Sequence, residues 1–288
     1  MKFPHPKNKQ HYFIYKDGKF ENVFDKDEKT KILVYSQNFD GWNNDLTNMK
    51  SSMSSTNHPI DRASIYVCNY LINKYSQKKN NIILEIGCLN GELTKNIIKQ
   101  KKYKYIGSDA SLSNIVELSK EHKDIPFIVF DLTQNPFKNS ICDILIILNV
   151  LEHIEKDDLA LIETFNLLND NGILIVEVPS FKFLYDDYDK KLLHFRRYDP
   201  SDIENKIKKA GFYIEKKTHL GFFTFPIFSL VKLFNKLLKI NNIVEKEIKI
   251  SNNFLIKFLF YLEKKFMKFN LPFGIRTVIC ARKKFKDS

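Results

Sequence analysis

The chain has 288 residues, of which 43% are hydrophobic, so it can bury one large core or one core with a small appendage. Its formal net charge is +12, but the 46 basic residues are 41 scattered Lys and only five Arg, without an RNP motif or zinc knuckle, so nucleic acid is not expected as a partner. No stretch reaches about 18 uncharged apolar residues and the amino terminus has no apolar signal region, which argues against secretion and a spanning helix and favours a cytoplasmic location.

The amino-terminal part is expected to be an extension, residues 1–60, ahead of a main domain over residues 61–288. Within the extension, the run Lys16-Asp17-Gly18-Lys19 predicts a hairpin turn between two short strands. The segment Asn38 to His58 is rich in Ser and Asn and is predicted to be a loop that orders over a cofactor. A helix is predicted from Asp61 to Tyr75.

The main domain begins with an apolar strand followed by a glycine turn. Ile82 to Ile86 is apolar without alternation, as in a strand that is covered on both faces. Gly87 and Gly91 lack a Cβ, so the backbone can turn sharply there and approach a ligand. A helix then begins at Leu93. This order predicts a nucleotide-type cofactor at the carboxyl edge of a parallel sheet and, taken alone, fits a dinucleotide dehydrogenase nearly as well.

Three further strands each end in a polar residue. Tyr105 to Asp109 ends in a carboxylate placed to accept hydrogen bonds from ribose hydroxyls, and Phe127 to Phe130 is followed by Asp131. The strand Cys142 to Leu148 continues into Asn149-Val150-Leu151-Glu152-His153. Because the carboxyl ends of parallel strands meet at one edge of a sheet, these side chains are expected to converge on one site.

The remaining elements complete the fold prediction. A fifth strand, Gly172 to Val178, precedes a loop and a helix near Pro200 to Ala210, and the strand Gly211 to Thr218 finds its best antiparallel partner in Arg276 to Arg282. The predicted fold class is α/β, a Rossmann-like, doubly wound, mostly parallel seven-stranded sheet with an antiparallel last strand and a helical insertion, residues 221–272, before it.

The insertion is predicted to hold two amphipathic helices, Phe225 to Ile240 and Asn253 to Phe269. Each carries a narrow Lys-rich polar stripe and a wide apolar face, which suits peripheral contact with a membrane interface. The alternative is that both helices pack on the domain itself or on a second copy of the chain in a homodimer.

The glycine turn and the strand ends carry a family resemblance. The run Glu85-Ile86-Gly87-Cys88-Leu89-Asn90-Gly91 resembles the acidic-x-Gly-x-Gly-x-Gly motif of class I, Rossmann-like, S-adenosylmethionine-dependent methyltransferases, with Leu89 in place of the middle glycine. The segment Asn149 to Ile154 resembles that family's stretch after the fourth strand. The resemblance covers roughly residues 60–220 and implies S-adenosyl-L-methionine as the cofactor.

By this resemblance Glu85 and Gly87 lie near the methionine moiety, Asp109 holds the ribose hydroxyls, and Asp131 with Leu132 meets the adenine. The implied cofactor-binding residues are Glu85, Gly87, Cys88, Asn90, Gly91, Asp109, Ala110, Asp131, Leu132 and Asn149. Taken singly, each has a simpler reading: Glu85 as an ordinary strand-end carboxylate, and Asp109 as the N-cap of a helix starting near Ser111.

The four cysteines, Cys68, Cys88, Cys142 and Cys280, lie in mostly apolar contexts without metal-ligand spacing and are expected to be buried thiols in a reducing compartment. Cys88, inside the glycine turn, is the one expected to approach the cofactor.

Two of the five Arg are adjacent, in the run Asp189 to Tyr198, which resembles the H-x-R-R-Y element of a bacterial methyltransferase subgroup associated with cell-surface glycan and lipid-linked pathways. Because Arg grips carboxylates and phosphates with a planar fork, Arg196, Arg197 and Tyr198 are predicted to bind substrate. The alternative is a structural salt bridge from one Arg to Asp186, Asp187 or Asp189, with the other facing water. No metal is expected at these carboxylates, since further oxygen ligands are lacking.

The catalytic candidates are His153 and His194, because methyl transfer to an acceptor needs a base with a pKa near neutrality. Glu152 is expected to orient His153, to contact the cofactor, or to serve the next helix. The predicted function is methyl transfer to a hydroxyl, less favourably a carboxylate or amine, of a small-molecule or lipid-linked glycan acceptor in the cytoplasm or at the inner face of the membrane. The alternatives are an RNA methyltransferase and a catalytically silent membrane-interface module with the same fold.

Overall fold

A computed structural model of the chain describes residues 1–8, 10–25, 27–36, 58–76, 80–100, 102–238, 254–266 and 268–284. The predicted loop Asn38 to His58 lies outside the described residues except for His58, which accepts a hydrogen bond from the Ile60 backbone N–H at the start of helix α2 (Pro59–Tyr75).

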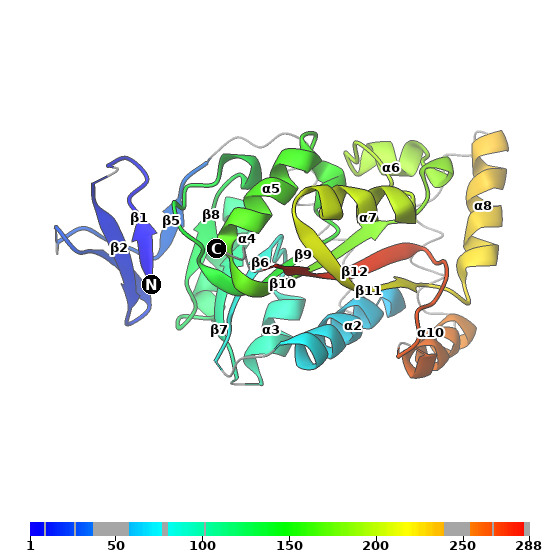
Figure 1. Cartoon of the computed structure of the whole chain (residues 1–288), viewed down its shortest axis with the longest axis horizontal. Coiled ribbons are helices and arrows are strands. Elements are labelled where there is room, and N and C mark those ends of the chain that lie inside the picture. Colours follow the sequence, from blue (N-terminus) through cyan, green and yellow to red (C-terminus); the bar gives the residue numbers. More distant parts are fainter. Residues whose placement is uncertain are drawn as a thin grey trace.

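The centre of the molecule is an eight-stranded sheet in the order β11-β12-β10-β9-β6-β7-β8-β5 (Figure 1). Its strands are β5 (Ile32–Val34), β6 (Ile82–Ile86), β7 (Lys104–Ser108), β8 (Phe127–Val129), β9 (Cys142–Leu148), β10 (Leu168–Pro179), β11 (Phe212–Leu220) and β12 (Arg276–Lys283). The strands from β10 to β5 pair in parallel, whereas β12 runs antiparallel to both β10 and β11. The predicted Rossmann-like class, with its antiparallel last strand, is confirmed.

The predicted count of seven strands is one too low. The eighth strand, β5, comes from the amino-terminal extension and pairs with the edge strand β8, Leu33 opposite Ile128. Leu33 is buried there, so this strand extends the core as well as the hydrogen-bonded ladder. Three residues are too few to show a period, which is why the sequence pattern did not identify this strand.

The chain reverses its direction of strand addition between β6 and β9. It proceeds from β6 outward through β7 to β8 and then returns to place β9 on the other side of β6. At such a switch point the loops that leave two neighbouring strands diverge, and the gap between them is where open α/β sheets bind ligands. The fold therefore predicts a ligand-binding site at the residues just beyond Ile86 and Leu148.

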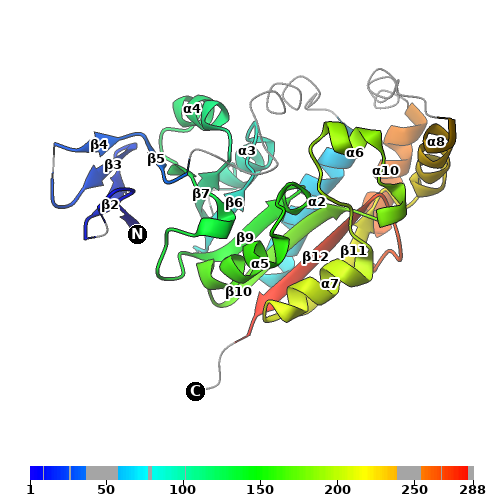
Figure 2. The ribbon, with the colours of Figure 1, turned by 90° about the horizontal axis from the view of Figure 1, so that it is seen from above.

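Two apolar clusters cover the two faces of the sheet, because successive strand residues point to opposite sides. Ile83 and Ile144 belong to one cluster, whereas Leu84 and Leu145 belong to the other. Helices α2, α3 (Glu92–Ile98), α4 (Leu112–Glu121) and α10 (Phe254–Phe266) contribute to the first cluster. Helices α5 (Asp157–Leu167) and α7 (Pro200–Lys209) contribute to the second. Figure 2 shows the helices on both sides of the central strands.

A small antiparallel sheet of four strands lies at one end of the molecule (Figures 1 and 2). Its strands are β1 (Lys2–Pro4), β2 (Tyr12–Lys16), β3 (Lys19–Asn22) and β4 (Lys29–Thr30). The predicted hairpin is present, with Lys16 paired to Lys19 and positive φ at Asp17 and Gly18, the conformation that two-residue hairpin turns favour. Phe3, Phe13 and Phe20 are buried and join the core of the main sheet.

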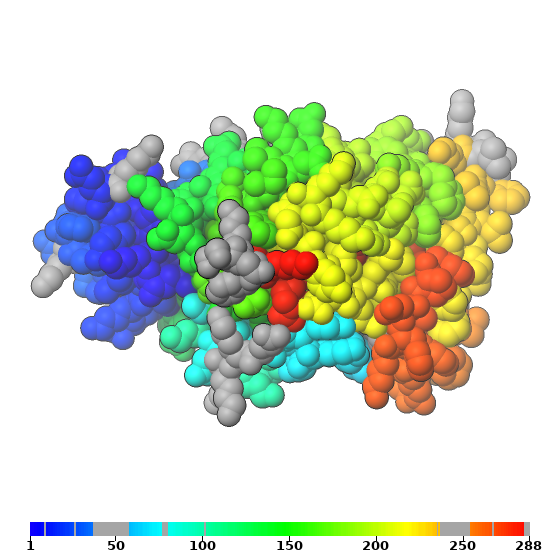
Figure 3. All heavy atoms as spheres, viewed as in Figure 1, coloured from blue at the N-terminus to red at the C-terminus, as the bar shows by residue number. Residues whose placement is uncertain are grey.

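The insertion between β11 and β12 contains α8 (Phe225–Leu238) and α10. The two helices lie at the opposite end of the molecule from the small sheet (Figure 3). Residues 239–253, including the predicted ends Ile240 and Asn253, fall outside the described part of the chain. None of the helices in the described ranges is long and apolar enough to cross a membrane.

One lysine of the polar stripe of α8, Lys232, faces the protein, whereas Lys236 is exposed. Lys232 is buried and its Nζ lies 2.8 Å from Asp186 Oδ1 and 2.9 Å from Asp189 Oδ2, whereas Ile227, Leu230 and Phe234 are each at least 60% exposed. A helix that packs on its own domain ordinarily turns its apolar face inward. Here the order is inverted, and the wide apolar face is left at the surface.

Candidate active site at the carboxyl edge of the sheet

A cavity of about 120 Å³ opens beyond the carboxyl ends of β6 and β9, where the fold predicts a site. Its lining comes from α2, the turn after β6, the start of α3, the end of β9 and the start of β12. The lining residues are Asp61, Ser64, Ile65, Glu85, Gly87, Cys88, Leu89, Asn90, Glu92, Leu93, Leu148, Asn149 and Arg276. Five of the predicted cofactor-binding residues are among them. The other five, Gly91, Asp109, Ala110, Asp131 and Leu132, lie outside this lining, most of them beyond the neighbouring strands β7 and β8.

The turn after β6 has the backbone conformation that glycine favours. Gly87 and Gly91 have φ of 80° and 74°. A Cβ at Gly87 would lie 2.4 Å from Val150 Cγ2, so the close approach that requires glycine there is to the protein's own β9 loop rather than to a ligand. Leu89, at the position of the middle glycine, has φ of 42°, in the left-handed region that costs a non-glycine residue roughly 1–2 kcal/mol. The turn thus keeps its shape despite the substitution.

Glu85 is a buried carboxylate at the floor of this cavity. Its Oε2 accepts hydrogen bonds from Thr94 Oγ1, at 3.0 Å, and from the Tyr105 hydroxyl. Burial raises the pKa of Glu85 to about 7, since it outweighs the two hydrogen bonds that favour the ionised form, and the nearby Asp109 raises the pKa further. A cationic ligand in the cavity would favour the ionised carboxylate.

The carboxylates beyond β7 and β8 hold local backbone. Asp109 accepts a hydrogen bond from the Leu89 N–H at 2.7 Å and from the Ser111 N–H at 2.8 Å, and so ties the glycine turn to the end of β7. The N-cap of α4 is Ser111 rather than Asp109. Asp131 caps the short 3-10 helix η1 (Leu132–Gln134) through Thr133. Each carboxylate oxygen has a second acceptor position, so these bonds are compatible with ligand hydroxyls or amines.

Cys88 contributes to the cavity from the turn, but its thiol is buried. It lies in the apolar cluster on the α2 face, and burial raises the pKa of the thiol well above its ordinary value. The thiol therefore stays protonated. All four cysteines are free and buried, as predicted.

A polar network that the sequence did not reveal closes one side of the cavity. Glu177, at the end of β10, accepts hydrogen bonds from Ser64 Oγ, Asn149 Nδ2 and Arg276 Nη1, each at 2.8 Å, and Arg276 also pairs with Asp61. These bonds fix α2 against the ends of β9 and β12. The rarity of Arg in this Lys-rich chain was the one available signal for Arg276.

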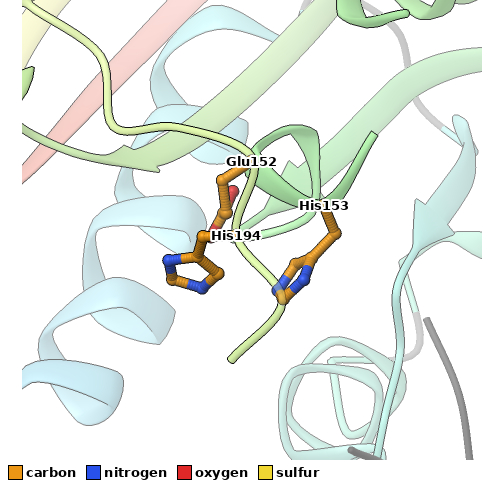
Figure 4. A group of neighbouring side chains, drawn as sticks. All are labelled: Glu152, His153 and His194. Atoms are coloured by element: carbon orange, nitrogen blue, oxygen red, sulfur yellow. The ribbon is translucent and has the colours of Figure 1, made fainter. Parts of the chain in front are cut away.

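Glu152, His153 and His194 lie together on the loops beyond the sheet (Figure 4). Glu152 and His153 come from the short 3-10 helix η2 (Leu151–His153), which begins two residues after the cavity-lining Asn149. His194 comes from the turn that ends helix α6 (Asp187–Lys191). The two imidazole rings meet edge to face with centroids 4.7 Å apart. The two predicted catalytic residues are thus in contact, and all three side chains are buried.

His194 is held by a buried carboxylate. Its Nδ1 lies 3.0 Å from Asp189 Oδ1, and Asp189 also pairs with Arg197 Nε and Lys232 Nζ. Burial alone would raise the pKa of Asp189, but the hydrogen bond from His194 and the charges of Arg197 and Lys232 outweigh it and hold that pKa well below its ordinary value. An ionised carboxylate only accepts, so Nδ1 of His194 donates to Asp189 and Nε2 is the ring nitrogen that remains for other contacts.

Arg197 is paired within the protein through its Nε. Its Nε donates to both oxygens of Asp189, at 2.9 and 2.8 Å, and the residue is buried. This is the salt bridge that the sequence left open as the alternative, and the acidic run at Asp186 and Asp189 is neutralised by Arg197 and Lys232. Arg197 is accordingly placed to support His194 through Asp189, and its role in substrate binding stays a prediction.

Arg196 and Tyr198 share a different carboxylate. Arg196 Nη1 lies 2.9 Å from Asp157, and the buried Tyr198 hydroxyl donates to Asp157 Oδ2 at 2.8 Å. Arg196 was predicted either to bind substrate or to face water, but these contacts pair it with Asp157 of the protein itself. The three residues position the loop that carries His194 against the start of α5.

The donor set of the cavity fits S-adenosyl-L-methionine. That molecule carries a sulfonium and an ammonium charge beside one carboxylate, and the lining offers the carboxyl groups of Glu85, Glu92 and Asp61 beside the guanidinium of Arg276. Asp109, next to the turn, supplies the acceptor that ribose hydroxyls need.

Comparisons with known proteins agree with this chemistry. A family model described as "Methyltransferase domain" matches residues 60–217, more than half of the chain. No curated protein matches it in sequence.

Many solved structures share the fold at low identity. Phosphoethanolamine N-methyltransferase 2 of Haemonchus contortus, in complex with S-adenosyl-L-methionine, is 16% identical with a TM-score of 0.50, covering 75% of this chain and 52% of that one. A TehB-like methyltransferase of Corynebacterium glutamicum is 13% identical with a TM-score of 0.52, covering 84% and 100%. The [4+2]-cyclase SpnF is 15% identical with a TM-score of 0.53, covering 77% and 82%. At these identities the likeness shows the fold alone, and the family match identifies the protein: the chain belongs to the methyltransferase-domain family, as a class I methyltransferase that uses S-adenosyl-L-methionine as its cofactor.

Proposed function

We propose that the protein transfers a methyl group from S-adenosyl-L-methionine to a hydroxyl of a small-molecule or lipid-linked glycan acceptor. The observation that carries this proposal is the contact between His153 and His194 on loops next to the cavity-lining Asn149. A hydroxyl needs a base before it can attack a methyl carbon, and neutral imidazole is the side chain suited to that role near pH 7.

The cofactor supplies a methyl group on a sulfonium sulfur, and this sulfur keeps the bonding electron pair as the acceptor oxygen forms its bond to the methyl carbon. The proton of the acceptor goes to an imidazole nitrogen. Asp186 and Asp189 are paired with Arg197 and Lys232, and Asp189 also holds Nδ1 of His194, so the ring is fixed in direction.

The experiment is an assay for S-adenosylhomocysteine formation with a panel of acceptors: free glycans, polyprenyl-linked glycans, amines and RNA oligonucleotides. We expect turnover on a hydroxyl-bearing glycan. His194→Gln should lower kcat by about 10²–10⁴-fold, the ordinary contribution of a general base, with the affinity for cofactor unchanged. The control is His122→Gln, because His122 follows α4 and so lies at the amino edge of the sheet. Turnover confined to RNA or amines would contradict the proposal.

A second proposal is that α8 and α10 rest on a membrane surface, which would bring a lipid-linked acceptor to the site. The outward face of α8 and the exposed Phe254, Leu255 and Tyr261 of α10 support it, together with exposed Lys beside them and the net charge of +12. Apolar side chains that enter the interface and cations that meet anionic headgroups act together in such contacts.

Co-sedimentation with vesicles tests this second proposal. The protein should bind phosphatidylglycerol vesicles more tightly than phosphatidylcholine vesicles, and the double variant Phe234→Glu/Phe254→Glu should lose binding. Phe24→Glu is the matched control, since Phe24 is 58% exposed at the opposite end of the molecule. Equal binding of the double variant and the control would contradict the membrane contact.

A further inference from the structure

We infer that Glu152, His153 and His194 form a binding site for one divalent transition-metal ion. One ligand atom from each residue lies within 4.8 Å of the ligand atoms of the other two, and all three residues are buried. Two ligand atoms on the same side of one ion, each at about 2.1 Å from it, are about 3.0–3.4 Å apart, so the side chains rotate toward one another when they bind the ion. Two imidazoles and one carboxylate on one side of an ion are a recognised donor set for first-row divalent metals, and they leave coordination positions open.

The surroundings of His194 match those of a metal ligand. Metal-bound imidazoles almost always donate their second ring N–H to a carboxylate or carbonyl, which fixes the tautomer and the direction of the ligating nitrogen. His194 Nδ1 has this partner in Asp189, at 3.0 Å, and Asp189 is itself fixed by Arg197 and Lys232. Nε2 is then the nitrogen that His194 has left to offer an ion, and the His194 ring meets the His153 ring edge to face (Figure 4).

The backbone at His194 is also fixed by the sequence around it. Leu193 has φ of 55°, and the N–H groups of Leu193 and His194 donate to the carbonyls of Lys190 and Asp189, which is the Schellman arrangement at the end of α6. A non-glycine residue in the left-handed region costs about 1–2 kcal/mol. Such outliers concentrate at functional sites, where surrounding contacts hold them.

The role of this ion rests on the proposed function, although its binding does not. A divalent ion with open positions lowers the pKa of a bound hydroxyl and also orients it. Deprotonation of the acceptor is then assisted by the ion, and the proton leaves to solvent. Glu152 distinguishes the two mechanisms, because an imidazole base requires no carboxylate at that position, whereas the metal site does.

The experiment measures metal and cofactor separately on the same samples. Chelator-treated protein is titrated with Co²⁺, followed by visible absorption and by elemental analysis after dialysis, while calorimetry reports S-adenosylhomocysteine binding. We expect one Co²⁺ per chain with d–d bands. Glu152→Gln, His153→Asn and His194→Asn should each weaken Co²⁺ binding at least tenfold, and His122→Asn should leave it unchanged. Thermal melts verify that each variant is folded.

Several outcomes separate the two claims. Substoichiometric Co²⁺, or equal affinity in the Glu152→Gln variant and the wild type, would overturn the metal site whether or not the cofactor binds. Stoichiometric Co²⁺ that depends on these three residues, with no binding of S-adenosylhomocysteine, would support the metal site and contradict the proposed function.

Discussion

Asp189→Asn is the substitution that tests the buried ion-pair network most strongly, because the single carboxylate of Asp189 contacts three partners. Asp189 is 0% exposed and contacts His194, Arg197 and Lys232 at 2.8–3.0 Å. An amide of the same shape removes the charge and turns an NH₂ group toward donors. Removing one partner from a buried ion pair costs about 3–5 kcal/mol, since the opposite charges stay buried without compensation. We expect the free energy of unfolding to fall by about that amount.

The matched control lies two residues away. Asp187 is 59% exposed and pairs with Lys190 at 2.8 Å, a surface pair that water and salt screen, so Asp187→Asn should leave the free energy of unfolding nearly unchanged. Urea denaturation of Asp189→Asn and Asp187→Asn at pH 7 measures both. If Asp189→Asn stays within about 1 kcal/mol of the wild type, the assigned role of the buried network in positioning His194 is wrong.

Three further predictions concern other parts of the chain. Leu193→Gly should stabilise the protein by about 0.5–1 kcal/mol, because Leu193 is 37% exposed and has a left-handed φ that glycine adopts without strain. The control is Leu159→Gly, which should destabilise the protein by about 1 kcal/mol, because Leu159 is 38% exposed but lies inside α5. Urea denaturation measures both variants. Burial raises the pKa of Glu263 to about 7. Between about pH 4.5 and 7 the folded protein therefore binds more protons at this residue than the unfolded protein, and the free energy of unfolding falls as the pH rises through that window. Glu263→Gln should reduce this fall by about 2–3 kcal/mol, measured as the difference between unfolding at pH 5 and at pH 7.5. Glu85→Gln should weaken cofactor binding by about 10–100-fold in calorimetry, and in the wild type that binding should strengthen from pH 6 to 8 as the carboxyl with a pKa of about 7 ionises; pH-independent binding would refute this role.

The parts of the fold that the sequence predicted are those with strong local signals. The strand from Ile82 to Ile86 and the antiparallel pair around Thr218 and Val278 are long and apolar, and the glycines after β6 mark a turn that few other residues allow. The polar residues after the strands could be gathered at one edge because parallel strands share their direction. The contact between His153 and His194 follows from that edge and from the loop after β10.

The features that the sequence did not predict depend on long-range pairing. Lys232 is held inward by two carboxylates more than 40 residues earlier, Asp186 and Asp189, while the apolar side chains Ile227, Leu230 and Phe234 of α8 stay exposed. The left-handed φ of Leu193 has no sequence signature, since glycine is the residue that marks such positions. The spacing of apolar residues in the sequence predicts neither the inward position of Lys232 nor the left-handed φ of Leu193, because contacts in the folded chain determine both.

We place the binding site of S-adenosyl-L-methionine at the edge of the sheet beyond β6 and β9. Calorimetric titration of the folded protein with S-adenosylhomocysteine tests it most directly, beside Asp109→Asn and with Asp124→Asn, in the loop before β8, as the control. We predict binding of one molecule per chain that Asp109→Asn weakens at least tenfold and Asp124→Asn does not. Absence of binding to folded protein, or binding that Asp109→Asn leaves unchanged while NAD⁺ binds tightly, would contradict the claim.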